Sequence, residues 1–270
     1  RMRKSQSAIL AARPFATRME RLVRELALLQ EREDMASGAG APGLHPFFRK
    51  RPQGAELLLF VSGDKGLCGA FNANVLRAAI EWFKARSGRK SYCVAVGRKG
   101  RDMVHRLRGH DVEILAEVVG VFPKITYAHA ELVGQAVVDA YLNKGVSSVT
   151  VLYNEFKSVA QQRLLTGVLL PIPAPAVLPE TVALPDYGFE PERRRLQAAL
   201  LPRFVKAQIY RVLLESQAAE LAARMNAMDA ASKNAKELRE ALNLTANRTR
   251  QALITKEIAE LVGGAEALAA

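Results

Sequence analysis

The sequence predicts an α/β domain with a largely parallel sheet, flanked by a helical segment at each end of the chain. Three patterns indicate this arrangement. Strand-sized apolar runs alternate with amphipathic helical segments through the middle of the 270 residues. The opening segment repeats its apolar residues at three- and four-residue steps, as one face of a helix does. A long stretch near the other end, from Arg203 to Val262, contains neither glycine nor proline.

The opening segment, Met2–Glu33, is predicted to be a helix within an N-terminal helical region over residues 1–36. Pro14 falls inside the pattern, where a proline removes a helical hydrogen bond, so we expect a kink or a local break there. Basic residues, Arg13 and Arg18 among them, strongly outnumber acidic ones at the start of this segment. An Arg-rich amphipathic start also resembles a transit peptide, although here it continues into a regular helical pattern.

A linker rich in glycine is predicted over residues 37–54, and the α/β domain over residues 55–190. Strands are expected at Ala55–Ser62, Ser91–Val96, Val112–Val119, Ser148–Phe156 and Val159–Pro171. Helices are expected at Ala73–Arg86, Lys99–Leu107 and Ala128–Leu142. The alternation of strands and helices at these lengths favours a layered domain. Prolines from Pro171 to Pro185 then indicate an irregular connector.

The last region, residues 191–270, is predicted to be dominated by one long helix. We expect Pro191 to open a short helix and Pro202 to be the first residue of the next. The stretch without glycine or proline would extend about 90 Å as a helix, which indicates a coiled coil or a helical stalk. The opening helix can lie antiparallel against about half of it, so the remainder is expected to pack on another chain.

The composition limits the classes of function. A net charge of +12 implies acidic partners such as nucleic acid, anionic lipid or an acidic protein surface. No run of about 18 consecutive apolar residues occurs, so no membrane span is predicted. The two cysteines, Cys68 and Cys93, form no C-x-x-C pair and indicate a reducing compartment. The sequence has no helix-turn-helix, RNP or zinc signature of a nucleic-acid-binding protein.

The segment Gly63–Gly69 follows a predicted strand and precedes a helix, which is the position of a phosphate-binding loop. It matches neither G-x-x-x-x-G-K-S/T nor G-x-G-x-x-G, so a tight turn is favoured over a nucleotide site. Cys68 has no histidine nearby, which favours a packed thiol over a reactive one. The four histidines lack the spacing of metal ligands; they are His45, His105, His110 and His129. We therefore predict a non-catalytic chain without a cofactor or a metal.

Two segments together resemble the gamma subunit of rotary F-type ATP synthases. The first is Ser62-Gly-Asp-Lys-Gly-Leu-Cys-Gly-Ala-Phe-Asn72, similar to the family's S-x-D-R/K-G-L-C-G-x-x-N loop. The second lies between Glu215 and Ile258, where Ala222-Ala-Arg-Met-Asn-Ala-Met228 and Asn247-Arg-Thr-Arg-Gln-Ala-Leu-Ile-Thr-Lys-Glu-Ile258 match the family's helical signatures. The resemblance covers essentially the whole chain.

The resemblance implies a Rossmann-like α/β domain flanked by N- and C-terminal helices that form an antiparallel coiled coil. That coiled coil would be the central shaft inside the hexamer of alpha and beta subunits. Rotation of the membrane c ring, driven by ions, would turn the shaft and couple to ATP synthesis or hydrolysis on beta. The epsilon subunit would be a further partner, and the location would be peripheral, on the cytoplasmic face of the bacterial inner membrane.

The resemblance also implies roles for particular residues. Four would engage the hexamer: Arg250, Gln251, Thr255 and Glu257. Three would lie on a loop that faces an acidic lever of beta: Asp64, Lys65 and Cys68. Two would lie in the foot near the c ring and epsilon: Tyr187 and Glu190. Arg13 and Arg18 would add positive charge along the shaft.

The chain departs from this family in one respect. Members carry further residues ahead of the position that matches Arg1, so the first helix is expected to be incomplete here. The chloroplast-type insertion with its cysteine pair is missing, so thiol regulation is not expected. Two other interpretations remain: a coiled-coil scaffold or tether whose α/β domain has lost catalysis, and a nucleic-acid-binding protein.

Overall fold

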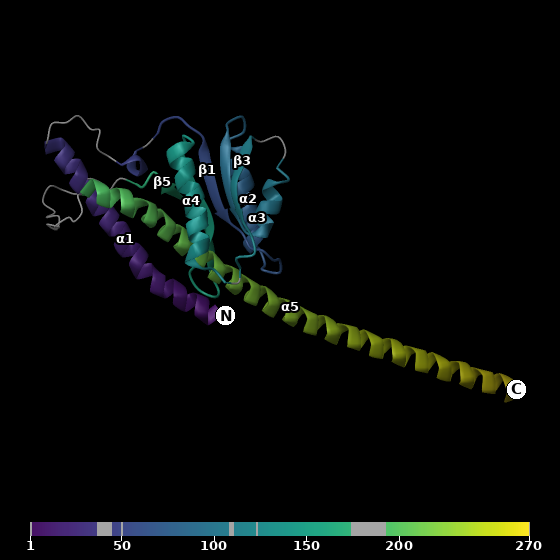
Figure 1. Cartoon of the computed structure of the whole chain (residues 1–270). Helices are drawn as coiled ribbons and strands as arrows, with labels where there is room; N and C mark the ends of the chain where they lie inside the picture. Colours follow the sequence, from purple (N-terminus) through teal and green to yellow (C-terminus); the bar gives the residue numbers. More distant parts are fainter. Residues whose placement is uncertain are drawn as a thin grey trace. The chain divides into compact units, whose positions relative to one another are not determined.

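A computed structural model describes residues 2–36, 45–49, 51–107, 111–122, 124–173 and 193–269 of the chain. The chain divides into two compact units, Arg1–Met225 and Asn226–Ala270. The first unit contains a sheet with helices on both of its faces (Figure 1). The second unit consists of the last part of a single helix, α5, which begins at Arg193 in the first unit and ends at Ala269.

The sheet has five strands in the order β3-β2-β1-β4-β5. Its strands are β1 Glu56–Val61, β2 Ser91–Val96, β3 Val112–Val118, β4 Ser148–Phe156 and β5 Gln162–Leu170. The first four are parallel, and β5 runs antiparallel to β4 at one edge. The order 3-2-1-4 is that of a Rossmann-type sheet, so the prediction of a largely parallel sheet is confirmed.

Two helical layers cover the sheet. On one face lie α2, Phe71–Lys84, and α3, Arg98–Val104. On the other face lie α4, Tyr127–Asn143, and the first part of α5, with α1, Met2–Ala36, packed into the same core (Figure 1). All eight predicted strands and helices of the domain are present, with ends that differ by up to three residues from the expected ones.

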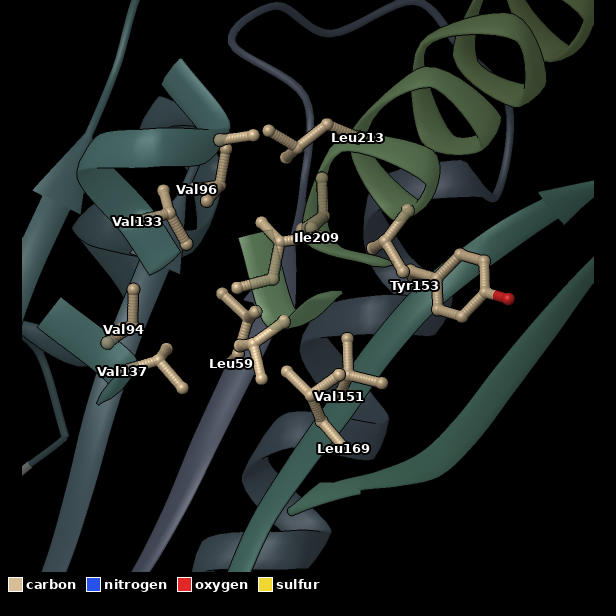
Figure 2. Close-up of a cluster of buried hydrophobic side chains, with 14 of the residues drawn as sticks. Leu59, Val94, Val96, Val133, Val137, Val151, Tyr153, Leu169, Ile209 and Leu213 are labelled. Atoms are coloured by element: carbon tan, nitrogen blue, oxygen red, sulfur yellow. The ribbon is translucent and has the colours of Figure 1, made fainter. Parts of the chain in front are cut away.

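The side chains of strand β1 contribute to two hydrophobic cores, one on each face of the sheet. Leu57, Leu59 and Val61 point into the core with α4 and α5, whereas Leu58 and Phe60 point into the core with α2 and α3. Successive side chains of a strand alternate between faces, so a strand covered on both sides must be apolar throughout. Figure 2 shows Leu59 beside Val94 and Val137, with Ile209 of α5 completing the layer.

Helices α1 and α5 are antiparallel neighbours within the first unit, as predicted. Arg13 near the start of α1 contacts Glu215, whereas Leu26 near its end accepts a hydrogen bond from Gln197. A residue early in α1 thus contacts a later part of α5, and a residue late in α1 contacts an earlier part, as in any antiparallel pair of helices. Of the kink or local break expected at Pro14, the break does not occur, because α1 continues through this residue.

The expectation that Pro202 starts a new helix is wrong, because α5 begins at Arg193 and runs through Pro202. A proline inside a helix removes one hydrogen bond and crowds the preceding turn. Here the residues on both sides of it, Leu201 and Phe204, are buried in the core. Their burial, at about 2 kcal/mol for each large apolar side chain, offsets the cost of the interior proline. Pro191 lies outside the described residues.

In the second unit, residues 228–265 of α5 are all exposed. Exposed apolar side chains recur along it, among them Leu238, Leu242, Leu253, Ile254 and Ile258. In the described residues, no helix is both long enough and apolar enough to span a membrane. The division of the chain into four parts at residues 36, 54 and 190 stays a prediction.

Candidate functional site

The loop between β1 and α2, residues 62–70, carries the first sequence motif and follows the carboxyl end of a parallel strand. Its turn depends on Leu67 at φ 60° and Gly69 at φ 55°. Glycine adopts such left-handed values at little cost, whereas a leucine there costs about 1–2 kcal/mol. Leu67 is nevertheless 75% exposed, so its own burial does not stabilise this conformation. The contacts of its neighbours must do so.

The carboxylate of Asp64 holds this loop from the inside. Its Oδ1 accepts hydrogen bonds from the backbone N–H of Arg98 at 3.0 Å and of Gly120 at 2.9 Å, and its Oδ2 accepts one from Phe122 at 3.2 Å. Asp64 is 7% exposed. The buried charge is therefore compensated by three backbone donors, which tie the loop to the start of α3 and to the segment after β3.

Asn72 closes the same loop from the first turn of α2. Its Oδ1 accepts the N–H of Gly63 at 2.8 Å, and its Nδ2 donates to the carbonyl of Lys65 at 3.0 Å and to Sγ of Cys68 at 3.2 Å. The Cys68 thiol is buried, and this burial raises its pKa. A protonated, packed thiol is the arrangement that the sequence favoured over a reactive one.

A pair of charged residues on α5 connects the loop to the helix. Nη2 of Arg224 donates to the carbonyl of Gly66 at 3.2 Å and to Oε1 of Glu220 at 2.7 Å. Glu220 is 3% exposed, and a Cβ placed on Gly63 would come within 3.0 Å of its Oε1. The loop and α5 approach so closely that position 63 has little room for a side chain.

A second charged contact joins α1, α5 and the end of β4. Nε and Nη2 of Arg13 donate to Oε1 of Glu215 at 3.1 and 3.0 Å, and Nη2 also reaches the carbonyl of Phe156 at 3.1 Å. Oε2 of Glu215 accepts the N–H of Phe156 at 3.1 Å, and Glu215 is 1% exposed. The charge of Arg13 is thus matched by Glu215. Only Arg18 of the two predicted shaft arginines remains open on α1.

The four residues expected to engage a hexamer are all exposed in the second unit. Arg250 and Glu257 are seven residues apart and share one side of the helix, where side chains repeat every 3.6 residues. Thr255 turns its hydroxyl back to the carbonyl of Gln251, at 2.8 Å. The role predicted for these four residues stays a prediction.

The three predicted loop residues differ in their exposure to solvent. Lys65 is exposed, whereas Asp64 and Cys68 are buried, so Lys65 is the side chain of the three that is open to a partner. Tyr187 and Glu190 lie outside the described residues. In the ranges that the structure describes, no three His, Cys, Asp or Glu side chains could together hold a metal ion.

Sequence reasoning did not identify the positioning roles of Glu215 and Glu220. Both lie on the stripe of α5 that faces the core, next to Ala218, Ala219 and Ala222. A glutamate on an otherwise small and apolar stripe was the available signal, because a buried carboxylate requires a cation or several donors. Their partners come from α1, β4 and the β1–α2 loop, which are distant in sequence.

The comparisons with known proteins agree with this geometry at the level of class. The fold is similar to that of chains in solved structures of ATP synthase rotors and central stalks. The family described as ATP synthase matches residues 1–268. A chain in a structure of the Euglena gracilis mitochondrial ATP synthase with OSCP, F1 and c-ring is similar at a TM-score of 0.59, with 17% identity, and 99% of this chain and 94% of that one are covered. A chain of the Tetrahymena thermophila mitochondrial central stalk and c-ring has a TM-score of 0.53, with 20% identity and coverage of 81% and 99%.

Closer relatives specify the family. The ATP synthase gamma chain of Elusimicrobium minutum is 42% identical, with 99% of this chain and 89% of that relative covered. The gamma chain of Desulfitobacterium hafniense is 39% identical over the same shares. The chain belongs to the family of ATP synthase gamma chains.

Proposed function

We propose that this chain is the central rotor shaft of an F-type ATP synthase, which couples rotation of a membrane c ring to catalysis on beta subunits. The observation that carries the proposal is the contrast within α5. Its first part is fixed in the α/β unit by buried charges, and residues 228–265 are exposed with a row of apolar side chains. Exposed large apolar side chains that recur along one helix mark an interaction surface.

The finer assignments follow from this proposal. The exposed part of α5 and its residues Arg250, Gln251, Thr255 and Glu257 would turn inside a hexamer of alpha and beta. Contacts by exposed charges are worth about 1 kcal/mol or less each, so a rotor can form and break them at every step. The α/β unit would contact epsilon and the c ring, and the protein would be peripheral to the membrane. The gamma-chain relatives favour this reading over a scaffold or tether.

A break in α5 tests the proposal. Ala231→Pro removes a helical hydrogen bond and costs the helix about 3 kcal/mol, at a position outside the first unit. In the purified, membrane-reconstituted complex we expect ATP hydrolysis to continue while ATP-driven ion pumping falls severalfold. Ala231→Ser, which keeps the helical hydrogen bond, serves as the matched control and should pump normally.

Two outcomes would contradict the proposal. One is coupled ATP synthesis at the control rate in the Ala231→Pro complex. The other is a native complex of this chain, isolated with its partners, that contains no ATP-hydrolysing hexamer. The fold of the α/β unit is checked separately by the fluorescence of Trp82, the only tryptophan of the chain, which is 9% exposed.

A further inference from the structure

A cavity of about 220 Å³ lies between α1, α5 and strands β4 and β5. One wall is apolar and includes Val151, Leu165, Leu169, Phe204 and Val212. At the share of about 30 Å³ that a water molecule has in the liquid, the space corresponds to about seven water-sized groups. All of its lining residues belong to the first unit.

One buried polar group in the lining of this cavity, the side-chain amide of Gln208, is only partly hydrogen-bonded. Gln208 is 6% exposed, and its Oε1 accepts from Nε of Arg211 at 3.1 Å. Its Nε2 is buried and has no hydrogen-bond partner among the described residues. A buried donor left without an acceptor costs about 1–3 kcal/mol, and such groups in native proteins are rare. The amide N–H of Gln208 therefore requires a hydrogen-bond acceptor inside the cavity.

The charges around the cavity point to an anionic acceptor. Arg24, Arg211 and Glu20 contribute charged side chains to the lining. The carboxylate of Glu20 is already engaged by Nη2 of Arg24. The guanidinium of Arg211 gives its Nε to Gln208 and makes no ion pair within the described ranges. Arg211 also lines an adjoining pocket with Glu155 and Glu215, but none of the described residues forms an ion pair with it. Its guanidinium and the amide N–H of Gln208 are therefore donors that together suit a carboxylate.

Among the described residues, Nε of Arg86 and Oγ of Ser216 also lack partners, but neither residue lines this cavity. Tyr153 belongs to the lining, and Figure 2 shows its ring at the edge of the apolar cluster with the oxygen directed away from Ile209. An apolar wall with a few convergent polar groups is the usual make-up of a small-molecule site.

We propose that this cavity binds a small monocarboxylate with an apolar body of about five carbons, a size set by its volume. The carboxylate accepts from Nε2 of Gln208 and from the guanidinium of Arg211. The hydrocarbon packs against Leu165, Leu169 and Phe204. This site goes beyond the proposed rotor function and does not depend on it.

Hexanoate titrated into the full chain tests the proposal, with the backbone amide resonances of Gly167 and Val168, which line the cavity, followed by NMR. We expect saturable shifts of these resonances with a dissociation constant on the order of 1 mM, because a ligand of eight heavy atoms supports only modest affinity. Hexanol and hexylammonium, which have the same body without a carboxylate, should cause no saturable shift.

Two variants and a matched control locate the binding. Gln208→Glu keeps an acceptor for Arg211 and replaces the orphaned donor with a negative charge, so hexanoate affinity should fall about tenfold or more. Arg211→Gln should weaken binding by a similar factor. Arg163→Gln removes an exposed β5 arginine outside the cavity and should leave binding unchanged.

The result that overturns the proposal is equally specific. Saturable shifts could be absent at tens of millimolar hexanoate. Hexanol could bind as well as hexanoate, or both Gln208→Glu and Arg211→Gln could keep full affinity. Any one of these three results would overturn the proposal. Water alone in the cavity would give the first of these results. Circular dichroism of each variant confirms that the chain is folded before titration.

Discussion

Two stretches of helix α5 have the same backbone conformation and very different surroundings. In residues 193–225, apolar side chains such as Val205, Ile209 and Leu213 are buried, and the carboxylates of Glu215 and Glu220 are held by arginines. In residues 228–265, every side chain is exposed. Helical propensity alone does not distinguish the two stretches, since both are rich in alanine and leucine. We infer from this difference that tertiary contacts stabilise the first stretch, whereas the second is available to other chains.

The largest expected effect comes from removing the buried carboxylate of the first stretch. Glu215→Ala leaves the N–H of Phe156 and the guanidinium of Arg13 without their acceptor, which should lower the free energy of unfolding by about 3 kcal/mol. Urea unfolding followed by Trp82 fluorescence measures this change for the first unit.

The matched control for this change is Glu240→Ala in the second stretch, where the glutamate is exposed. We expect a change within about 0.5 kcal/mol, as is usual for surface substitutions. Equal effects of the two alanine variants would remove the distinction between the stretches.

An intermediate effect is expected in the loop that α5 contacts. Asp64→Asn keeps the shape of the side chain but directs an NH₂ group at one of its backbone donors, so the free energy of unfolding should fall by about 2 kcal/mol. The loosened loop should also expose Cys68, whose buried thiol has a raised pKa. Its reaction with a thiol reagent at pH 8 should therefore be faster in the variant than in the parent chain.

Lys65→Ala provides the comparison within the same loop. Lys65 is exposed, so this variant should unfold like the parent and should leave the thiol as slow as before. A parent-like thiol rate in Asp64→Asn would show that other contacts hold the loop.

The smallest effect on stability is expected in the second stretch itself. Arg250→Ala removes an exposed side chain, so the free energy of unfolding of the isolated chain should change by less than about 0.5 kcal/mol. In the assembled complex, the same variant should lower coupled ATP synthesis, because the proposed function gives Arg250 a contact with the hexamer. A large loss of stability in the isolated chain would instead place Arg250 in an internal contact.

The sequence predicted the central strands well because β1, β2 and β4 are buried, strand-length apolar runs between turn residues. Ser91–Val96 and Ser148–Phe156 begin and end as expected. It failed at Pro202, since the local preference of proline was outweighed by the burial of Leu201 and Phe204, which a single sequence does not reveal. The antiparallel direction of β5 was not predicted either, because the residue pattern of a strand is the same in either direction.

The candidate site was predictable only in outline. The motif around Asp64 located the loop, and the length of α5 indicated a helix that needs further partners. The inward orientation of Asp64 depends on Gly120 and Phe122, whose N–H groups lie more than fifty residues away in the chain. The role of Arg13 likewise depends on Glu215, which is separated from it by 202 positions. Pairings of this kind are set by the tertiary fold and leave no local pattern.

The Asp64 carboxylate also has a consequence for how the chain responds to the composition of its surroundings. Related folds close the corresponding loop on a phosphate group, so its order varies with the concentration of a soluble nucleotide. Here the anion is covalently part of the chain, and its effective concentration is fixed by the fold itself. The loop should therefore be equally ordered whether ATP is plentiful or scarce, and a substitution of Asp64 would release it.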